Sequence, residues 1–141
     1  MKIEYGDGIF EIDIEKTKQY YQTNSLCDCA GCRNYYSQVI KKLPYCKEFL
    51  LQFGIDIERP DEIGWVELEN DTIYYLFVGY TVVGEIIVPS KERLYIKENE
   101  RSYSIIIDNE YIPNEQKGKY FVISINDFSF PWELNERFPQ K

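Results

Sequence analysis

The sequence predicts an α+β protein: a twisted antiparallel sheet of about six or seven strands with one kinked or broken helix packed on one face. Three observations predict it. The first third of the chain carries an apolar stripe at helical spacing. The remainder alternates runs rich in Tyr, Ile, Val and Phe with turn residues, as antiparallel strands do. No linker or repeat divides the 141 residues, so we expect a single domain over residues 1–141.

The N-terminal segment predicts a β-hairpin. Residues 3–5 and 9–14 flank a tight turn at Gly6-Asp7-Gly8. The second run has the period-2 pattern of a half-buried strand, because its apolar residues alternate with acidic ones: Phe10, Glu11, Ile12, Asp13 and Ile14. Residues 16–24 fit either a short helix or an extended segment.

A helix follows the first cysteines. Its apolar residues are spaced 3, 1, 3, 3, 4 and 3 apart: Tyr36, Val39, Ile40, Leu43, Cys46, Leu50 and Phe53. Gly54 supplies a C-cap. Pro44 removes a backbone donor and clashes with the preceding turn, which predicts a kink or two abutting helices. Because the stripe stays in phase across Pro44, we expect the kink.

The second half predicts a meander of strands. Residues 64–69 and 72–79 flank a hairpin turn at Asn70-Asp71, and a further strand covers residues 80–88. Residues 93–98 and 102–107 flank a second hairpin turn, and residues 119–125 form the last strand. The aromatic tail, residues 126–141, is expected to pack on the sheet as an irregular arm, because its aromatic surface is costly to leave in water.

The composition excludes several classes of function. The chain has no histidine, which removes Ser-His-Asp and Cys-His catalysis and any Cys2His2 zinc finger. A net charge of −8 repels a phosphate backbone, so we expect no nucleic-acid partner. No apolar run approaches the roughly 20 residues of a membrane span. The N-terminus lacks the apolar region of a signal peptide, and we expect a cytoplasmic protein with reduced cysteines.

Cys27, Cys29 and Cys32 form the most specific local pattern, C-x-C-x-x-C at the start of the predicted helix. Spacings this short let thiolates converge on one metal ion, and free N–H groups at a helix N-terminus stabilise thiolates. We therefore consider three interpretations: a site for zinc or another soft metal, a redox-active Cys29–Cys32 pair, and cysteines that are only structural or capping. No other cofactor is expected.

Cys46 cannot complete a four-cysteine site. A helix over residues 33–43 advances by about 16 Å, whereas the three residues from Leu43 to Cys46 span at most roughly 10 Å. Cys46 also lies on the apolar stripe and is predicted to be a core thiol. A fourth ligand would have to be water, Asp or Glu, and Asp28 would be strained in that role.

The chain resembles a family of uncharacterised bacterial small proteins over residues 27–84. The resemblance rests on Cys27-x-Cys29-x-x-Cys32-x-Asn34-Tyr35, on Leu50-x-x-Phe53-Gly54-Ile55-Asp56-x-x-x-Pro60-x-Glu62, and on Tyr75, Gly79 and Gly84. It implies that the Cys/Asn segment is a shared structural device, and it implies no catalytic residues. Asn34 is expected to hydrogen-bond within the first helical turn.

With no catalytic constellation in the sequence, we expect a non-enzymatic protein-interaction module. Its acidic charge favours a basic protein partner, since opposite charge speeds association. An immunity or antitoxin protein that caps a basic toxin is a narrower form of this hypothesis. The alternative is a zinc-binding or redox protein that uses the thiols of Cys27, Cys29 and Cys32. The sequence does not select an oligomeric state.

Overall fold

The structure is a computed structural model, and it describes residues 1–139. Over this range the chain forms seven antiparallel strands and three helices, which confirms the α+β class. The strands are β1 (Lys2–Tyr5), β2 (Gly8–Ile12), β3 (Glu62–Leu68), β4 (Thr72–Val88), β5 (Leu94–Glu98), β6 (Arg101–Asp108) and β7 (Tyr120–Pro131). The helices are α1 (Ile14–Thr23), α2 (Ala30–Lys42) and α3 (Pro44–Leu51).

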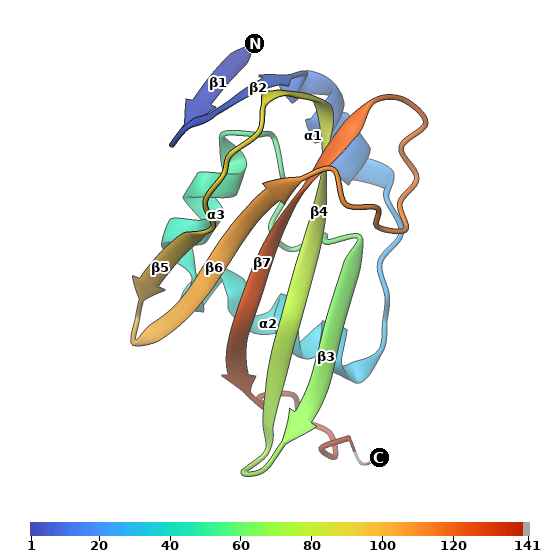
Figure 1. Ribbon diagram of the computed structural model, residues 1–141. Helices are drawn as coiled ribbons and strands as arrows, with labels where there is room; N and C mark the ends of the chain where they lie inside the picture. The colour runs from blue at the N-terminus through green and yellow to red at the C-terminus, as the bar shows by residue number, and fades with distance from the viewer. Residues whose placement is uncertain (140–141) are drawn as a thin grey trace.

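β4 and β7 form the centre of the sheet, whose strand order is β1-β2-β4-β7-β6-β5. β4 is one continuous strand of 17 residues, where the sequence predicted two. Along one side it pairs first with β3 and then, beyond Gly79, with β2. Along the other side it pairs with β7, from Thr72 opposite Pro131 to Val83 opposite Tyr120. α2 and α3 lie behind the sheet, and the opposite face is turned to the viewer (Figure 1).

Two positions on β4 and its hairpin require unusual backbone conformations. Asn70 and Asp71 both have positive φ, as the predicted two-residue hairpin turn demands. At Gly84, φ is +152° and an added Cβ would overlap the carbonyl oxygen of Glu11 on β2. Only glycine allows the two strands to approach so closely there.

The predicted helix is broken at Pro44 into two abutting helices, which was the second alternative, and the expected kink does not form. α2 ends at Lys42 and α3 begins at Pro44, separated by Leu43 with φ −127° and ψ 58°. Proline pushes the preceding residue out of the helical region, and Pro44 itself fits the first position of a new helix. The carboxylate of Glu98, at the end of β5, accepts the backbone N–H groups of Tyr45 and Cys46 at 3.1 Å each and so caps α3.

α1 resolves the ambiguous segment as a helix, one more than the sequence predicted. Asp13 begins it, with its carboxylate accepting the N–H of Lys16 at 3.0 Å. Next to α1, the Asp61 carboxylate accepts hydrogen bonds from the Tyr20 hydroxyl at 2.6 Å and the Thr81 hydroxyl at 2.7 Å. Burial raises the pKa of Asp61 above its usual range, although these hydrogen bonds oppose the change.

The expected irregular arm is wrong for residues 126–131, which continue β7. Phe128 and Phe130 point into the core, while Asp127, just before them, is exposed with φ +63°. The extension is stabilised by pairing with the first half of β4 and by burial of both rings. From Trp132 to Pro139 the chain has no regular helix or strand, as predicted.

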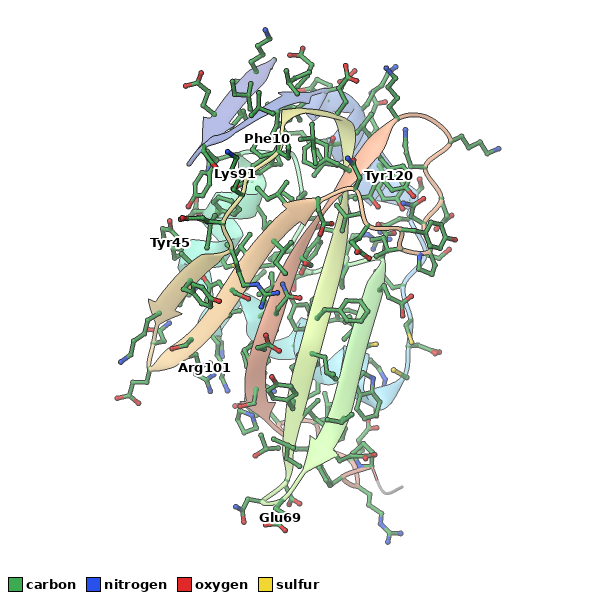
Figure 2. All side chains as sticks on the ribbon, in the orientation of Figure 1. Phe10, Tyr45, Glu69, Lys91, Arg101 and Tyr120 are labelled. Atoms are coloured by element: carbon green, nitrogen blue, oxygen red, sulfur yellow. The ribbon has the colours of Figure 1, made fainter. Side chains whose placement is uncertain are left out.

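The core lies between the sheet and the helices and is rich in aromatic rings. Tyr35 of α2 stacks on Phe130 at 6.0 Å between ring centroids, and Tyr75 stacks on Phe128 at 5.2 Å. The helical stripe differs from the prediction at two places, because Tyr35 is fully buried in place of Tyr36 and Ile40 is 37% exposed. Figure 2 shows Phe10 pointing into the protein and Glu69 at the tip of the β3–β4 hairpin.

Candidate functional site: a three-cysteine cluster at the start of α2

The sulfur atoms of Cys27, Cys29 and Cys32 all lie within 4.8 Å of one another. Cys27 belongs to the loop after α1, Cys29 is the N-cap of α2 and Cys32 lies in its first turn. Cys27 is exposed, Cys29 is half-buried and Cys32 is buried. The three thiols therefore form a compact cluster that opens to solvent at Cys27, and they are close enough together to hold a metal ion.

The floor of the cluster is formed by Trp65 of β3. Its indole lies against Gly31, where an added Cβ would come within 2.6 Å of Trp65 Nε1 and closer still to two ring carbons. The Tyr75 hydroxyl donates to the Gly31 carbonyl at 2.8 Å, which ties the first turn of α2 to β4. A glycine between Cys29 and Cys32 thus lets α2 sit directly on the indole.

Two side chains of α2 hold the loop that carries the cysteines. The Tyr36 hydroxyl donates to the Cys27 carbonyl at 2.8 Å. Arg33 Nε donates to the Asp28 carbonyl at 2.8 Å, and its two terminal nitrogens form a bidentate pair with Glu136 at 2.6 and 2.9 Å. These hydrogen bonds hold the backbone at Cys27 and Asp28 against α2.

The surroundings of Cys29 and Cys32 shift the pKa values of the two thiols in opposite directions. Burial raises the pKa of Cys29, but the thiol and backbone N–H of Cys32, with help from the Cys27 thiol and the Trp65 indole, lower the pKa below its usual value. Burial raises the pKa of Cys32, and the Cys29 thiol adds to that effect. The thiol of Cys29 therefore loses its proton more readily than the thiol of Cys32.

Cys46 lies away from the cluster, in α3, where it is fully buried in the core. Burial raises the pKa of its thiol, as expected for an inert core cysteine. Among residues 1–139, no further cysteine or carboxylate joins the three clustered thiols, and the Asp28 side chain is not part of the group. Within the described residues, three thiols are thus close enough to hold a metal ion, and no fourth side chain joins them.

Asn34 has a different role from the one predicted. It is fully buried, and its amide donates to the carbonyl of Pro131 at 3.1 Å while its oxygen accepts the N–H of Glu133 at 3.0 Å. Gln38, one turn along α2, also donates to that oxygen at 2.9 Å and to Pro131 at 2.7 Å. Asn34 thus joins α2 to the end of β7.

Sequence reasoning missed the residues around the cluster. Trp65, Tyr75 and Glu136 come from distant parts of the chain, and no local pattern links them to the cysteines. Gly31 carried a usable signal, since a glycine within a helix usually has a packing reason.

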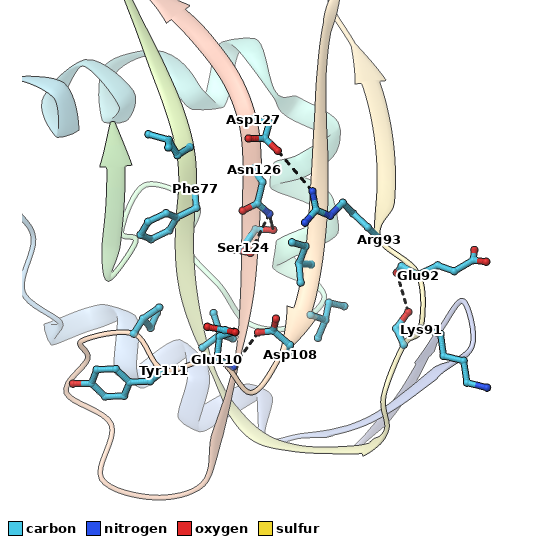
Figure 3. A pocket seen from close by; sticks show the side chains of 16 residues that line it. Phe77, Lys91, Glu92, Arg93, Asp108, Glu110, Tyr111, Ser124, Asn126 and Asp127 are labelled. Carbon is cyan, nitrogen blue, oxygen red and sulfur yellow. Dashed lines mark hydrogen bonds and ion pairs between the residues drawn. The ribbon is translucent and has the colours of Figure 1, made fainter. Parts of the chain in front are cut away.

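A second feature is a hollow of about 790 Å³ on the face of the sheet that the helices leave uncovered. Apolar side chains from β4, β6 and the following loop line it, including Phe77, Ile106 and Tyr111. Its ionisable lining residues are four acids and two bases: Glu92, Asp108, Glu110, Asp127, Lys91 and Arg93. Figure 3 shows Arg93 directed toward Asp127, at 3.7 Å between charged atoms.

No protein-family model, curated protein or solved structure matches the chain. The resemblance to bacterial small proteins with a C-x-C-x-x-C-x-N motif therefore stays a hypothesis from sequence. Within the described part of the chain, no helix has the length and apolarity needed to cross a membrane. The cytoplasmic location also stays a prediction.

Proposed function

We propose that the protein binds one zinc ion through the thiolates of Cys27, Cys29 and Cys32. The observation that supports this most strongly is the convergence of three sulfur atoms within 4.8 Å. With Zn–S bonds of about 2.3 Å, sulfurs at two corners of a tetrahedron are about 3.8 Å apart. The thiols need to approach one another by only about 1 Å, which rotation of exposed Cys27 and half-buried Cys29 can supply.

Thiolate ligands favour zinc over magnesium or calcium, which take oxygen ligands. The surroundings also suit an anionic ligand set, because Cys29 occupies the N-cap position of α2 and Arg33 lies beside the loop. Since the protein supplies three ligands, the fourth is a water molecule or a donor from a bound partner. Closed structural sites have four protein ligands, so an open position favours a role in binding.

The test is native mass spectrometry of protein purified without chelator, followed by zinc titration of the metal-free form. We expect one zinc per chain in the wild type and none when Cys27, Cys29 and Cys32 are all changed to Ser. Each single change should weaken zinc binding by more than about 100-fold. Losing a residue that only hydrogen-bonds to a metal ligand costs roughly 10- to 100-fold, and losing a ligand itself should cost more. Circular dichroism would verify that each variant is folded.

Cys46→Ser is the matched control, because it removes a thiol that lies outside the cluster. It should lower stability, since Cys46 is buried, but the folded fraction should still bind one zinc ion. Zinc retained by the triple variant, or absent from wild type supplied with zinc, would reject the proposal.

As a second function, we propose that the protein is an interaction module that binds a basic protein surface at the uncovered sheet face. The supporting observation is the hollow in that face, where carboxylates outnumber cations and apolar side chains are accessible. Tyr111 is 76% exposed there, and tyrosines of this kind are favoured in protein interfaces. An immunity or antitoxin protein for a basic toxin is the narrower form of this proposal.

This second function is tested by measuring association with a basic partner recovered from the native cells. Replacing Asp108 and Glu110 with Asn and Gln should slow association, and the rate should fall with salt. The matched control is the pair Glu67→Gln and Glu69→Gln on β3 and its turn, outside the hollow. Equal rates for both double variants, or a rate independent of salt, would reject the proposed surface.

A further inference from the structure

The cysteine cluster also supports an activity that needs no metal. We propose that Cys29 and Cys32 form a dithiol pair that exchanges with a disulfide substrate, with Cys29 attacking the substrate and Cys32 completing the reaction. This inference goes beyond zinc binding and does not depend on it, although both use the same cluster.

The positions of the two residues permit a direct bond between them. Residues three apart on a helix are neighbours, with Cβ atoms about 5–6 Å apart, and a disulfide needs a Cβ separation of about 3.5–4.5 Å. Cys29 is not confined to helical geometry, because as the N-cap it has φ −66° and ψ 161°. A small rotation at this residue closes the remaining gap between sulfur atoms that already lie within 4.8 Å.

Exposure assigns the two roles. Cys29 is half-buried and can be reached by a second molecule, whereas Cys32 is 3% exposed and cannot attack a substrate directly. Cys32 is in contact range of Cys29 and is therefore placed to attack the mixed disulfide that Cys29 forms. Cys46 is excluded because it is buried in α3, outside the cluster.

The chemistry balances with a disulfide as the oxidant. The Cys29 thiolate attacks one sulfur of the substrate, the substrate S–S bond breaks, and the leaving thiolate takes a proton from solvent. Cys32 gives its proton to solvent and attacks Cys29 Sγ, which forms the Cys29–Cys32 bond and releases the second substrate thiolate. The second thiolate also takes a proton from solvent, and Cys29 gives its proton to solvent before it attacks. In sum, two electrons pass from the protein dithiol to the substrate and two protons pass by way of solvent, so the substrate leaves as two thiols.

The experiment uses the whole reduced, chelator-treated protein with oxidised glutathione as the probe. Free thiols are blocked after fixed times, and peptide mapping locates each disulfide. In the wild type we expect a Cys29–Cys32 disulfide and no bound glutathione. In the double variant Cys27→Ser with Cys32→Ser we expect glutathione to remain attached to Cys29, because the cluster then holds no second thiol to release it. Cys29→Ser should slow the reaction of the cluster by at least about tenfold.

Several outcomes would overturn the proposal. They are a wild-type cluster that stays reduced, a disulfide that includes Cys27 in place of Cys29 or Cys32, and glutathione found on Cys32. The mapping of wild type needs no variant, so it decides the matter even if a substitution unfolds the chain. The Cys46→Ser variant, which removes a thiol outside the cluster, should give the same Cys29–Cys32 disulfide as wild type.

Cys27 separates this inference from zinc binding. A zinc site needs three thiolates here, whereas the disulfide needs two. If Cys27→Ser loses zinc but still yields the Cys29–Cys32 disulfide, both proposals stand. Zinc binding without disulfide formation rejects only the exchange reaction, and disulfide formation in a protein that never binds zinc rejects only the metal site.

Discussion

Replacing Gly31 with Ala tests how the cysteine cluster is seated on the sheet. Within a helix this change ordinarily stabilises, by about 0.5–1 kcal/mol, because glycine loses more backbone entropy on folding. Here the new methyl group would lie 2.6 Å from Trp65 Nε1 and closer to two ring carbons. We therefore expect the opposite sign.

The magnitude follows from how far the indole must move. Carbon atoms pack at about 3.5–4.0 Å and the nearest ring carbon would be 2.1 Å away, so the ring or the first turn of α2 has to shift by roughly 1.5 Å. Overpacking of this kind costs about 1–3 kcal/mol. With the gain in helix propensity subtracted, Gly31→Ala should lower the free energy of unfolding by about 1–2 kcal/mol.

Urea denaturation of a double-mutant cycle provides the assay. In a Trp65→Ala background the clash is gone, and Gly31→Ala should then stabilise the protein by about 0.5–1 kcal/mol. Gly118→Ala is the control for a glycine change in a loop, where the nearest atom is the flexible end of Gln116. A stabilising Gly31→Ala in the wild-type background, or equal effects in both backgrounds, would refute the reasoning.

Three further predictions concern stability. Glu98→Ala should lower the free energy of unfolding in urea by roughly 1–2 kcal/mol, because two N–H groups of α3 lose their acceptor. If Glu100→Ala lowers it by as much, the capping role of Glu98 is contradicted. The pKa of Asp61 is raised, so the folded state binds the proton of this carboxyl more tightly than the unfolded state does. Protonated Asp61 therefore stabilises the fold at low pH, and this stabilisation is lost as the pH rises from about 3.8 through the raised pKa. Thermal melts should accordingly show the stability of wild type relative to Asp61→Asn falling with pH over that window, and a rise would contradict the sign. Gly84→Ala should destabilise the protein by more than about 1 kcal/mol in the same melts, because the φ of +152° and the nearby Glu11 carbonyl leave no room for a Cβ. An unchanged stability would contradict this reasoning and show that β2 can move away from Gly84.

Local sequence patterns were sufficient for the features that depend on neighbouring residues. The Asn70-Asp71 hairpin and the meeting of Cys27, Cys29 and Cys32 both follow from short spacing, and the structure has both. The sequence also contains a signal for the start of α1, because Asp is a favoured N-cap residue and Asp13 precedes this helix. It was left ambiguous because the alternating residues before it continue the strand pattern into the helix.

Features that depend on distant contacts were not predictable in this way. The last strand was predicted to end at residue 125, yet β7 continues through Asp127 to Pro131, because pairing with β4 and burial of Phe130 stabilise the extension. In the same way, nothing in the local sequence marks Glu98 as a cap, because its carboxylate meets the N–H groups of α3 only when β5 lies beside that helix.

The pairing of β4 with β7 has a consequence for the kinetics of folding. These central strands lie far apart in sequence, with β5 and β6 between them, so their ends must meet across a long loop before any of their hydrogen bonds form. Closing such a loop is entropically costly, and proteins dominated by non-local strand pairs refold in milliseconds to seconds, where helical bundles need microseconds to milliseconds. The β3–β4 and β5–β6 hairpins are expected to form first, and the docking of β7 between them to limit the refolding rate.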